Sequence, residues 1–212
     1  APSFPTTIPY IDAVNNPDSG YVGMQAWQLF TSTYETYDKV YNKIKQADKT
    51  PYLGFMDELT PEAIDWQIKY LAEHGVDFIN QFYYRPYFLG AGQTPPEITH
   101  RAWLDTYLER CPEMAGKIKF SICISCESMN YFGTSEEFLS NFIPYLTERY
   151  FKNPNYLKYG NKPVVLMYNA GELVKKYGGE SSFNSILNQA RSWVAGQKDS
   201  QGNSLAGLIF IA

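Results

Sequence analysis

The stretch from Pro51 to Pro86 constrains the fold of this chain more than any other. Thr60 followed by Pro61 is a typical helix start, because threonine caps free backbone N–H groups and proline has the φ that a first turn needs. Apolar residues then recur at helical spacing, at Ile64, Ile68 and Leu71. Gly75 follows, where a helix end favours a left-handed residue. The stretch therefore predicts a helix that ends at a glycine.

A strand is predicted directly after this helix, from Val76 to Tyr84. Its first half is apolar, whereas its carboxyl end is polar and aromatic, with Gln81, Tyr83, Tyr84 and Arg85. A helix that leads into a strand in this way is one unit of an α/β fold. Ligands in such folds bind at the carboxyl ends of parallel strands. The end of this strand is therefore a predicted ligand-binding face.

Strands and helices alternate along the rest of the chain. Strands are predicted near 8–13, 76–84, 117–125, 163–168 and 207–212, and most of them are followed by a helix. This alternation favours a parallel sheet with right-handed helical crossovers, in the strand order 1-2-3-4-5. The 212 residues suffice for one core, so the chain is interpreted as a single α/β domain, 1–212.

Three further helices are predicted, from about Glu97 to Arg110, from Thr134 to about Phe151 and from Ser182 to Ala195. The second of them opens with a capping box, in which Thr134 and Glu137 bond each other's backbone N–H groups. Pro144 lies inside this helix and should kink it, because proline has no N–H to donate.

Composition narrows the classes of partner. A net charge of −4 and an isoelectric point near 5.3 disfavour a nucleic-acid or anionic-membrane partner. Aromatic residues make up 17%, with 18 tyrosines, which is more than a core needs. Tyrosine and tryptophan rings suit the apolar faces of sugars, although tyrosine also tolerates half-buried positions. No stretch of the sequence is apolar and long enough to span a membrane or to resemble an export signal.

The cysteines and histidines favour structural roles. Cys123 and Cys126 have C-x-x-C spacing, but on a strand residues three apart face opposite sides, which disfavours a metal or redox pair. His74 lies at the carboxyl end of the first helix, where a positive charge suits the dipole, and is expected on the rim opposite the ligand face. No glycine-rich phosphate loop follows a strand, so no cofactor is expected.

Several motifs occur in one order along the chain. Leu53-Gly54-Phe55-Met56-Asp57-Glu58 precedes a helix with Pro61-Glu62 and Ile64-Asp65-Trp66-Gln67-Ile68-Lys69, which ends in Glu73-His74-Gly75-Val76. Two later stretches, Pro154 to Gly160 and Lys162 to Asn169, continue the order. Over roughly Thr50 to Ala212 the sequence resembles glycoside hydrolase family 99 and its WbsX-like (GH99-like) relatives.

The resemblance implies a (β/α)8 TIM-barrel type of fold, of which about five β/α units are expected in this chain. The chain is then similar to the amino-terminal part of such a barrel. In family 99 two carboxylates perform catalysis, and the resemblance places both beyond Ala212. No catalytic residue is therefore assigned here, and the 212 residues alone are expected to lack catalytic activity.

Sugar binding is what the resemblance implies for this segment. The expected substrate-binding residues are Tyr10, Asp12, Gln81, Tyr83, Tyr84, Arg85, Glu127, Asn130 and Tyr168. Glu127 corresponds to a family glutamate that follows the third strand and would accept sugar hydroxyls; the alternative is a salt-bridged loop residue. Tyr83 would stack on a sugar or pack in the barrel. Five of these residues are expected to converge on one concave face: Gln81, Tyr83, Tyr84, Glu127 and Tyr168.

The leading hypothesis is an endo-acting glycoside hydrolase that cleaves glycosidic bonds in a polysaccharide or glycan. One alternative is a WbsX-like glycosyltransferase of polysaccharide biosynthesis, and another is a non-catalytic carbohydrate-binding protein. The expected partner is an oligo- or polysaccharide, with no metal and no nucleic acid. A periplasmic or secreted location, with the export signal removed, is expected.

Overall fold

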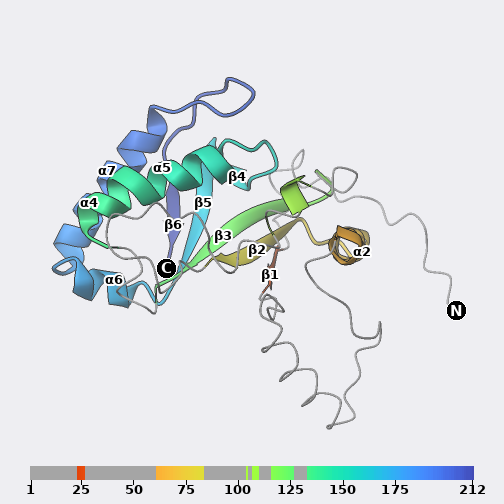
Figure 1. The fold of residues 1–212 in the computed structure, drawn as a ribbon, viewed down its shortest axis with the longest axis horizontal. Coiled ribbons are helices and arrows are strands. Elements are labelled where there is room, and N and C mark those ends of the chain that lie inside the picture. The colour runs from red at the N-terminus through yellow and green to blue at the C-terminus, as the bar shows by residue number, and fades with distance from the viewer. Residues whose placement is uncertain (1–22, 27–60, 84–103, 105–106, 110–115, 127–132) are drawn as a thin grey trace, which may run out of the picture.

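The computed structural model describes residues 23–26, 61–83, 104, 107–109, 116–126 and 133–212. These residues form a mixed α/β sheet (Figure 1). Its strands are β1 (Gly23–Ala26), β2 (Phe78–Tyr83), β3 (Lys119–Ser125), β4 (Lys158–Tyr159), β5 (Lys162–Tyr168) and β6 (Ile209–Ile211). Neighbours β1, β2, β3, β5 and β6 run parallel in that order, and only β4 pairs antiparallel, with the start of β5.

The strands expected at 76–84, 117–125, 163–168 and 207–212 are all present and follow one another across the sheet. The strand expected at 8–13 lies outside the described residues. The strand that pairs with the free edge of β2 is β1, a segment of four residues in which sequence analysis predicted no strand. So short a segment shows no hydrophobic period, and its pairing with β2 makes it a strand.

Helix α2 (Pro61–Glu73) confirms the helix predicted from Thr60 to Gly75. Ile64 and Ile68 are fully buried on its inner side. The helix closes at Gly75, whose φ of 75° lies in the left-handed region and whose N–H donates to Ala72 O at 3.2 Å. The chain enters β2 directly after this turn, so the glycine that ends the helix also determines where the strand begins.

The helical run from Ser135 to Phe151 is interrupted. It consists of α4 (Ser135–Glu137), η2 (Phe138–Phe142), α5 (Ile143–Leu146) and η3 (Thr147–Phe151), where η marks π-helical turns. The expected capping box is present: Glu137 N–H donates to Thr134 Oγ1 at 3.1 Å, and Thr134 N–H to Glu137 Oε2 at 2.7 Å. Pro144 lies in α5 between two π-helical turns, and Ile143 N–H donates to Phe138 O across five residues.

Two helices follow β5, α6 (Gly171–Lys176) and α7 (Glu180–Ala195). Helix α7 confirms the helix expected from Ser182 and starts two residues earlier, whereas α6 was not predicted. Of the helix expected at 97–110, Leu104 and residues 107–109 are described and are helical. No helix in the described part of the chain is long and apolar enough to cross a membrane.

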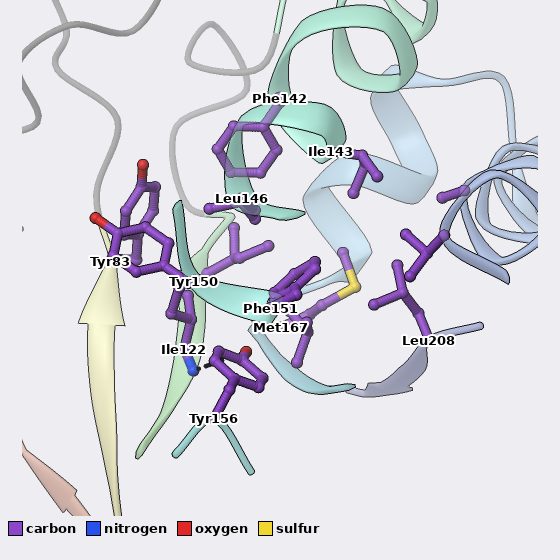
Figure 2. Close-up of a cluster of buried hydrophobic side chains, with 14 of the residues drawn as sticks. Tyr83, Ile122, Phe142, Ile143, Leu146, Tyr150, Phe151, Tyr156, Met167 and Leu208 are labelled. Carbon is purple, nitrogen blue, oxygen red and sulfur yellow. Dashed lines mark hydrogen bonds between the residues drawn. The ribbon is translucent and has the colours of Figure 1, made fainter. Parts of the chain in front are cut away.

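One continuous hydrophobic core joins the helices to one face of the sheet. Figure 2 shows side chains from β2, β3 and β5 meeting those of α5 and η3, with Leu208 at one side. The buried aromatic rings include Tyr83, Phe142, Tyr150, Phe151 and Tyr156. Because the helices bury this face, any site on the sheet has to lie on the opposite face or at the strand ends.

Candidate functional site

The two faces of the sheet differ in chemistry. Side chains alternate along a strand, so Ile79, Gln81 and Tyr83 share one face of β2, and Asn80 and Phe82 share the other. Ile79 and Tyr83 belong to the core beneath the helices. We call this the helix face and the opposite one the inner face. The same two faces continue onto β3, because Ser121 pairs in register with Asn80 and therefore lies on the inner face.

The inner face is polar at its centre. Asn80 Nδ2 donates to Ser121 Oγ at 2.7 Å, and the two residues are only 2% and 0% exposed. Asn80 Oδ1 is buried without a hydrogen-bond partner among the described residues. A buried amide oxygen without a partner is costly, so it suits a site that receives a donor from a ligand.

An aromatic pair lies at the carboxyl end of the same face. The rings of Phe82 and Tyr168 meet edge to face, with centroids 5.7 Å apart and planes at 75°. Tyr168 is the last residue of β5, is 50% exposed, and pairs in register with Ser125 at the end of β3. Asn169 then takes a φ of 58° and turns the chain toward α6. The inner face thus ends in an accessible tyrosine next to a buried serine.

The structure does not bring Gln81 and Tyr83 to the same face as Tyr168. Tyr83 is buried on the helix face, with its ring 5.9 Å from that of Phe142 and 6.0 Å from that of Tyr150 (Figure 2). Gln81 is 1% exposed on the same face, and neither atom of its amide has a partner among the described residues. The expected convergence of these three residues is therefore corrected, because residues two apart on a strand share a face and the helices bury the face of Gln81 and Tyr83.

Other expected site residues lie outside the described residues: Tyr10, Asp12, Tyr84, Arg85, Glu127 and Asn130. Their roles remain predictions. Conversely, sequence analysis missed Asn80, Phe82, Ser121 and Ser125, which form the inner face. The sequence feature that could have identified this face is the presence of two polar residues, Asn80 and Ser121, inside strands that are otherwise mostly apolar.

The two described cysteines lie on opposite faces, as their spacing predicted. Cys126 belongs to the core, and Cys123 shares the inner-face parity of Ser121; both are buried, and neither forms a disulfide. Burial, with a smaller contribution from Cys123, raises the pKa of Cys126 to about 12. The Cys126 thiol is therefore neutral at physiological pH, and a neutral thiol is a poor nucleophile and metal ligand. The described residues contain no group of three or more potential metal ligands.

His74 lies in the turn between α2 and the amino end of β2, on the rim away from Tyr168. Its Nδ1 is 2.7 Å from Tyr70 O, and its ring stacks on that of Tyr70 with centroids 4.2 Å apart. These contacts within one helix end agree with the structural role expected for this residue.

Comparison with known proteins shows which solved structures share this fold. No protein-family model and no curated protein matches the chain. Among solved structures, a glycoside hydrolase-like protein matches with a TM-score of 0.54 and 15% identity, over 90% of this chain and 51% of that one. This chain thus spans about half the length of that protein. At this identity the match shows a shared fold, a mixed α/β sheet consistent with part of a TIM-barrel type.

Two structures of the GH99 endo-alpha-mannosidase from Bacteroides thetaiotaomicron also match. The complex with bis-tris-propane has a TM-score of 0.38 at 18% identity, over 61% of this chain and 37% of that one. The other has a TM-score of 0.42 at 17% identity, over 66% and 38%. The solved structures that match therefore include the family that the sequence resembles.

Proposed function

We propose that this chain forms about five β/α units of a (β/α)8 barrel glycoside hydrolase of the family 99 type. Its inner face holds part of a glycan in this proposal. The observation that carries the proposal is the buried Asn80–Ser121 pair on the inner face, in which Asn80 Oδ1 has no hydrogen-bond partner among the described residues. The fold shared with a glycoside hydrolase-like protein supports it.

The chemistry of this face suits sugar hydroxyls. Asn80 Oδ1 would accept a hydrogen bond from a sugar hydroxyl, at a place where little water competes because Asn80 and Ser121 are buried. At the strand ends, the accessible ring of Tyr168 offers an apolar surface to the C–H face of a sugar. Polar groups at the centre and an aromatic ring at the edge would orient a sugar along the strand direction.

The polar groups of the described strand residues on the inner face are amide, hydroxyl, thiol and amino groups, with no carboxylate. Glycoside hydrolysis generally needs two carboxyl groups. In the proposed hydrolase, other parts of the protein therefore supply the acid and base, and the inner face binds substrate. The same observation favours a second candidate, a carbohydrate-binding protein without catalytic activity.

Release of reducing ends from α-mannan and from a β-glucan, by a protein that includes the rest of the proposed barrel, tests the proposal, together with calorimetric titration of the matching oligosaccharides. Hydrolysis is expected to release new reducing ends, with binding weakened by Tyr168→Ala. Binding without release would support the carbohydrate-binding candidate. Consumption of a nucleotide sugar, with no reducing ends released, would instead support a glycosyltransferase and overturn the hydrolase.

A further inference from the structure

A concave site lies among the helices, away from the inner face. It is a groove of about 740 Å³, within the range of about 300–1,000 Å³ typical of small-ligand sites. Figure 1 shows α7 beside α4 and α5, and residues from both sides line the groove. The lining residues are Ser135, Glu136, Leu139, Ser140, Pro144, Ile186, Gln189 and Trp193. None of them belongs to the inner face.

Trp193 is the aromatic side chain of this groove. It is 37% exposed, although tryptophan is usually well buried. Among the described residues, no ring stacks on its indole and no acceptor takes its Nε1–H. The groove therefore holds an indole with both an apolar ring and a donor still available.

Polar side chains with few or no partners among the described residues lie along the same groove. Glu136 forms no ion pair within the described part of the chain, and Gln189 uses only Nε2, in a long contact of 3.5 Å with Ser185 O. The Gln189 Oε1 acceptor and the Glu136 carboxylate remain available. Apolar side chains complete the lining, from Leu139, Pro144 and Ile186. The groove thus combines apolar surface with hydrogen-bonding groups of both kinds.

The outer surface of α7 also presents hydrogen-bonding side chains. Beyond the groove it presents a shallow hollow lined by Ser181, Asn184, Ser185, Asn188, Gln189 and Ser192. All of these are hydroxyl or amide side chains. An apolar partner helix would leave such groups without hydrogen bonds, which costs free energy. The surface offers no cluster of like charges to attract an ionic partner.

We infer that this groove is a second glycan-binding site, which takes a neutral oligosaccharide. A sugar matches the lining because one ring presents an apolar C–H face to the Trp193 indole, while its hydroxyls meet Glu136 and Gln189. The site shares no residue with the inner face, so it stands whether or not the proposed hydrolase function is correct.

Titration of the chain with α-mannotetraose, maltotetraose and cellotetraose tests this inference. The indole N–H resonance of Trp193, assigned with Trp193→Phe, is expected to shift on addition of at least one of the three. Trp193→Ala should raise the dissociation constant of that complex roughly tenfold, and Glu136→Gln should raise it less. Trp66→Ala, which alters an exposed tryptophan on α2, is the matched control and should bind unchanged.

The outcomes separate the two sites. If none of the three oligosaccharides moves the Trp193 resonance, the inference is overturned. It is also overturned if Tyr168→Ala abolishes all binding while Trp193→Ala has no effect, a result that would support the inner face alone. Binding that depends on Trp193 and not on Tyr168 supports the groove and counts against the proposed inner-face site.

Discussion

The Tyr156 hydroxyl accepts a hydrogen bond from the backbone N–H of Ile122 at 3.2 Å (Figure 2). The same hydroxyl donates to Val164 O at 2.8 Å, so one side chain bridges β3 and β5. It does so where residues 155–157 lie against the start of β3, with Leu157 N–H donating to Phe120 O at 2.7 Å. Burial raises the pKa of this hydroxyl, which stays protonated and can always donate.

Tyr156→Phe should lower the free energy of unfolding by about 2–3 kcal/mol, because two buried backbone groups lose their partner at once. Urea denaturation followed by circular dichroism measures the change. Tyr159→Phe is the matched control, since Tyr159 is largely exposed, and it should change stability by less than about 0.5 kcal/mol. Equal stability of the two variants would contradict the bridging role.

Cys126 should make stability depend on alkaline pH. Its pKa is about 12 in the folded chain against 9.0 for a free thiol, so below pH 9 it is protonated in both states and has no effect. Above that pH the unfolded chain loses the proton first, and stability falls by at most about 1.4 kcal/mol per pH unit up to pH 12. Denaturation curves at pH 8, 9.5 and 10.5 should show this loss.

Cys126→Ala is the control for that measurement, because it removes the thiol and leaves every other titrating group in place. The slope of stability against pH should be shallower for this variant than for the parent. Identical slopes would show that the Cys126 thiol is not held neutral by burial.

Gln81→Leu should stabilise the chain by about 1–2 kcal/mol, since it replaces a buried amide that has no partner among the described residues by an apolar side chain of similar size. Glycan affinity should not change, because Gln81 lies on the helix face. Gln201→Leu, at an exposed turn, should leave both quantities unchanged. Weaker glycan binding by Gln81→Leu would restore Gln81 as a ligand, as the sequence first suggested.

Tyr168→Ala should weaken glycan binding roughly tenfold while the free energy of unfolding falls by less than about 1 kcal/mol, because the ring is half exposed. Calorimetric titration and a melting curve give the two values. Tyr159→Ala removes an exposed tyrosine from β4, at the other end of the sheet, and should retain full affinity. A large loss of stability with unchanged affinity would make Tyr168 a packing residue.

In a full-length version of the protein, Glu127→Gln should weaken glycan binding roughly tenfold or more, since a carboxylate makes stronger hydrogen bonds to hydroxyls than an amide does. The melting temperature should barely move, because exposed carboxylates contribute little to stability. A salt-bridged glutamate would show the reverse, with unchanged affinity and a lower melting temperature.

Local chemistry made much of the fold readable in advance. The start of α2 at Pro61, its end at Gly75 and the capping box at Thr134 depend on hydrogen bonds and φ angles within a few residues. Four strands were recognisable because each is an apolar run of β-forming residues. Segment β1 was not, because its four residues become a strand only through pairing with β2.

The candidate site depended on packing between distant segments. Strand β2 has polar residues of both parities, Asn80 and Gln81, so alternation alone could not say which parity faces the helices. The rings of Phe142 and Tyr150, more than fifty residues away in sequence, pack on the ring of Tyr83 and bury it. Gln81 is two residues from Tyr83 on the same strand and therefore lies on the helix face as well. Asn80 is thereby left facing inward with Ser121. Periodicity settles spacing along a strand, and burial against the helices settles which side of the sheet each residue occupies.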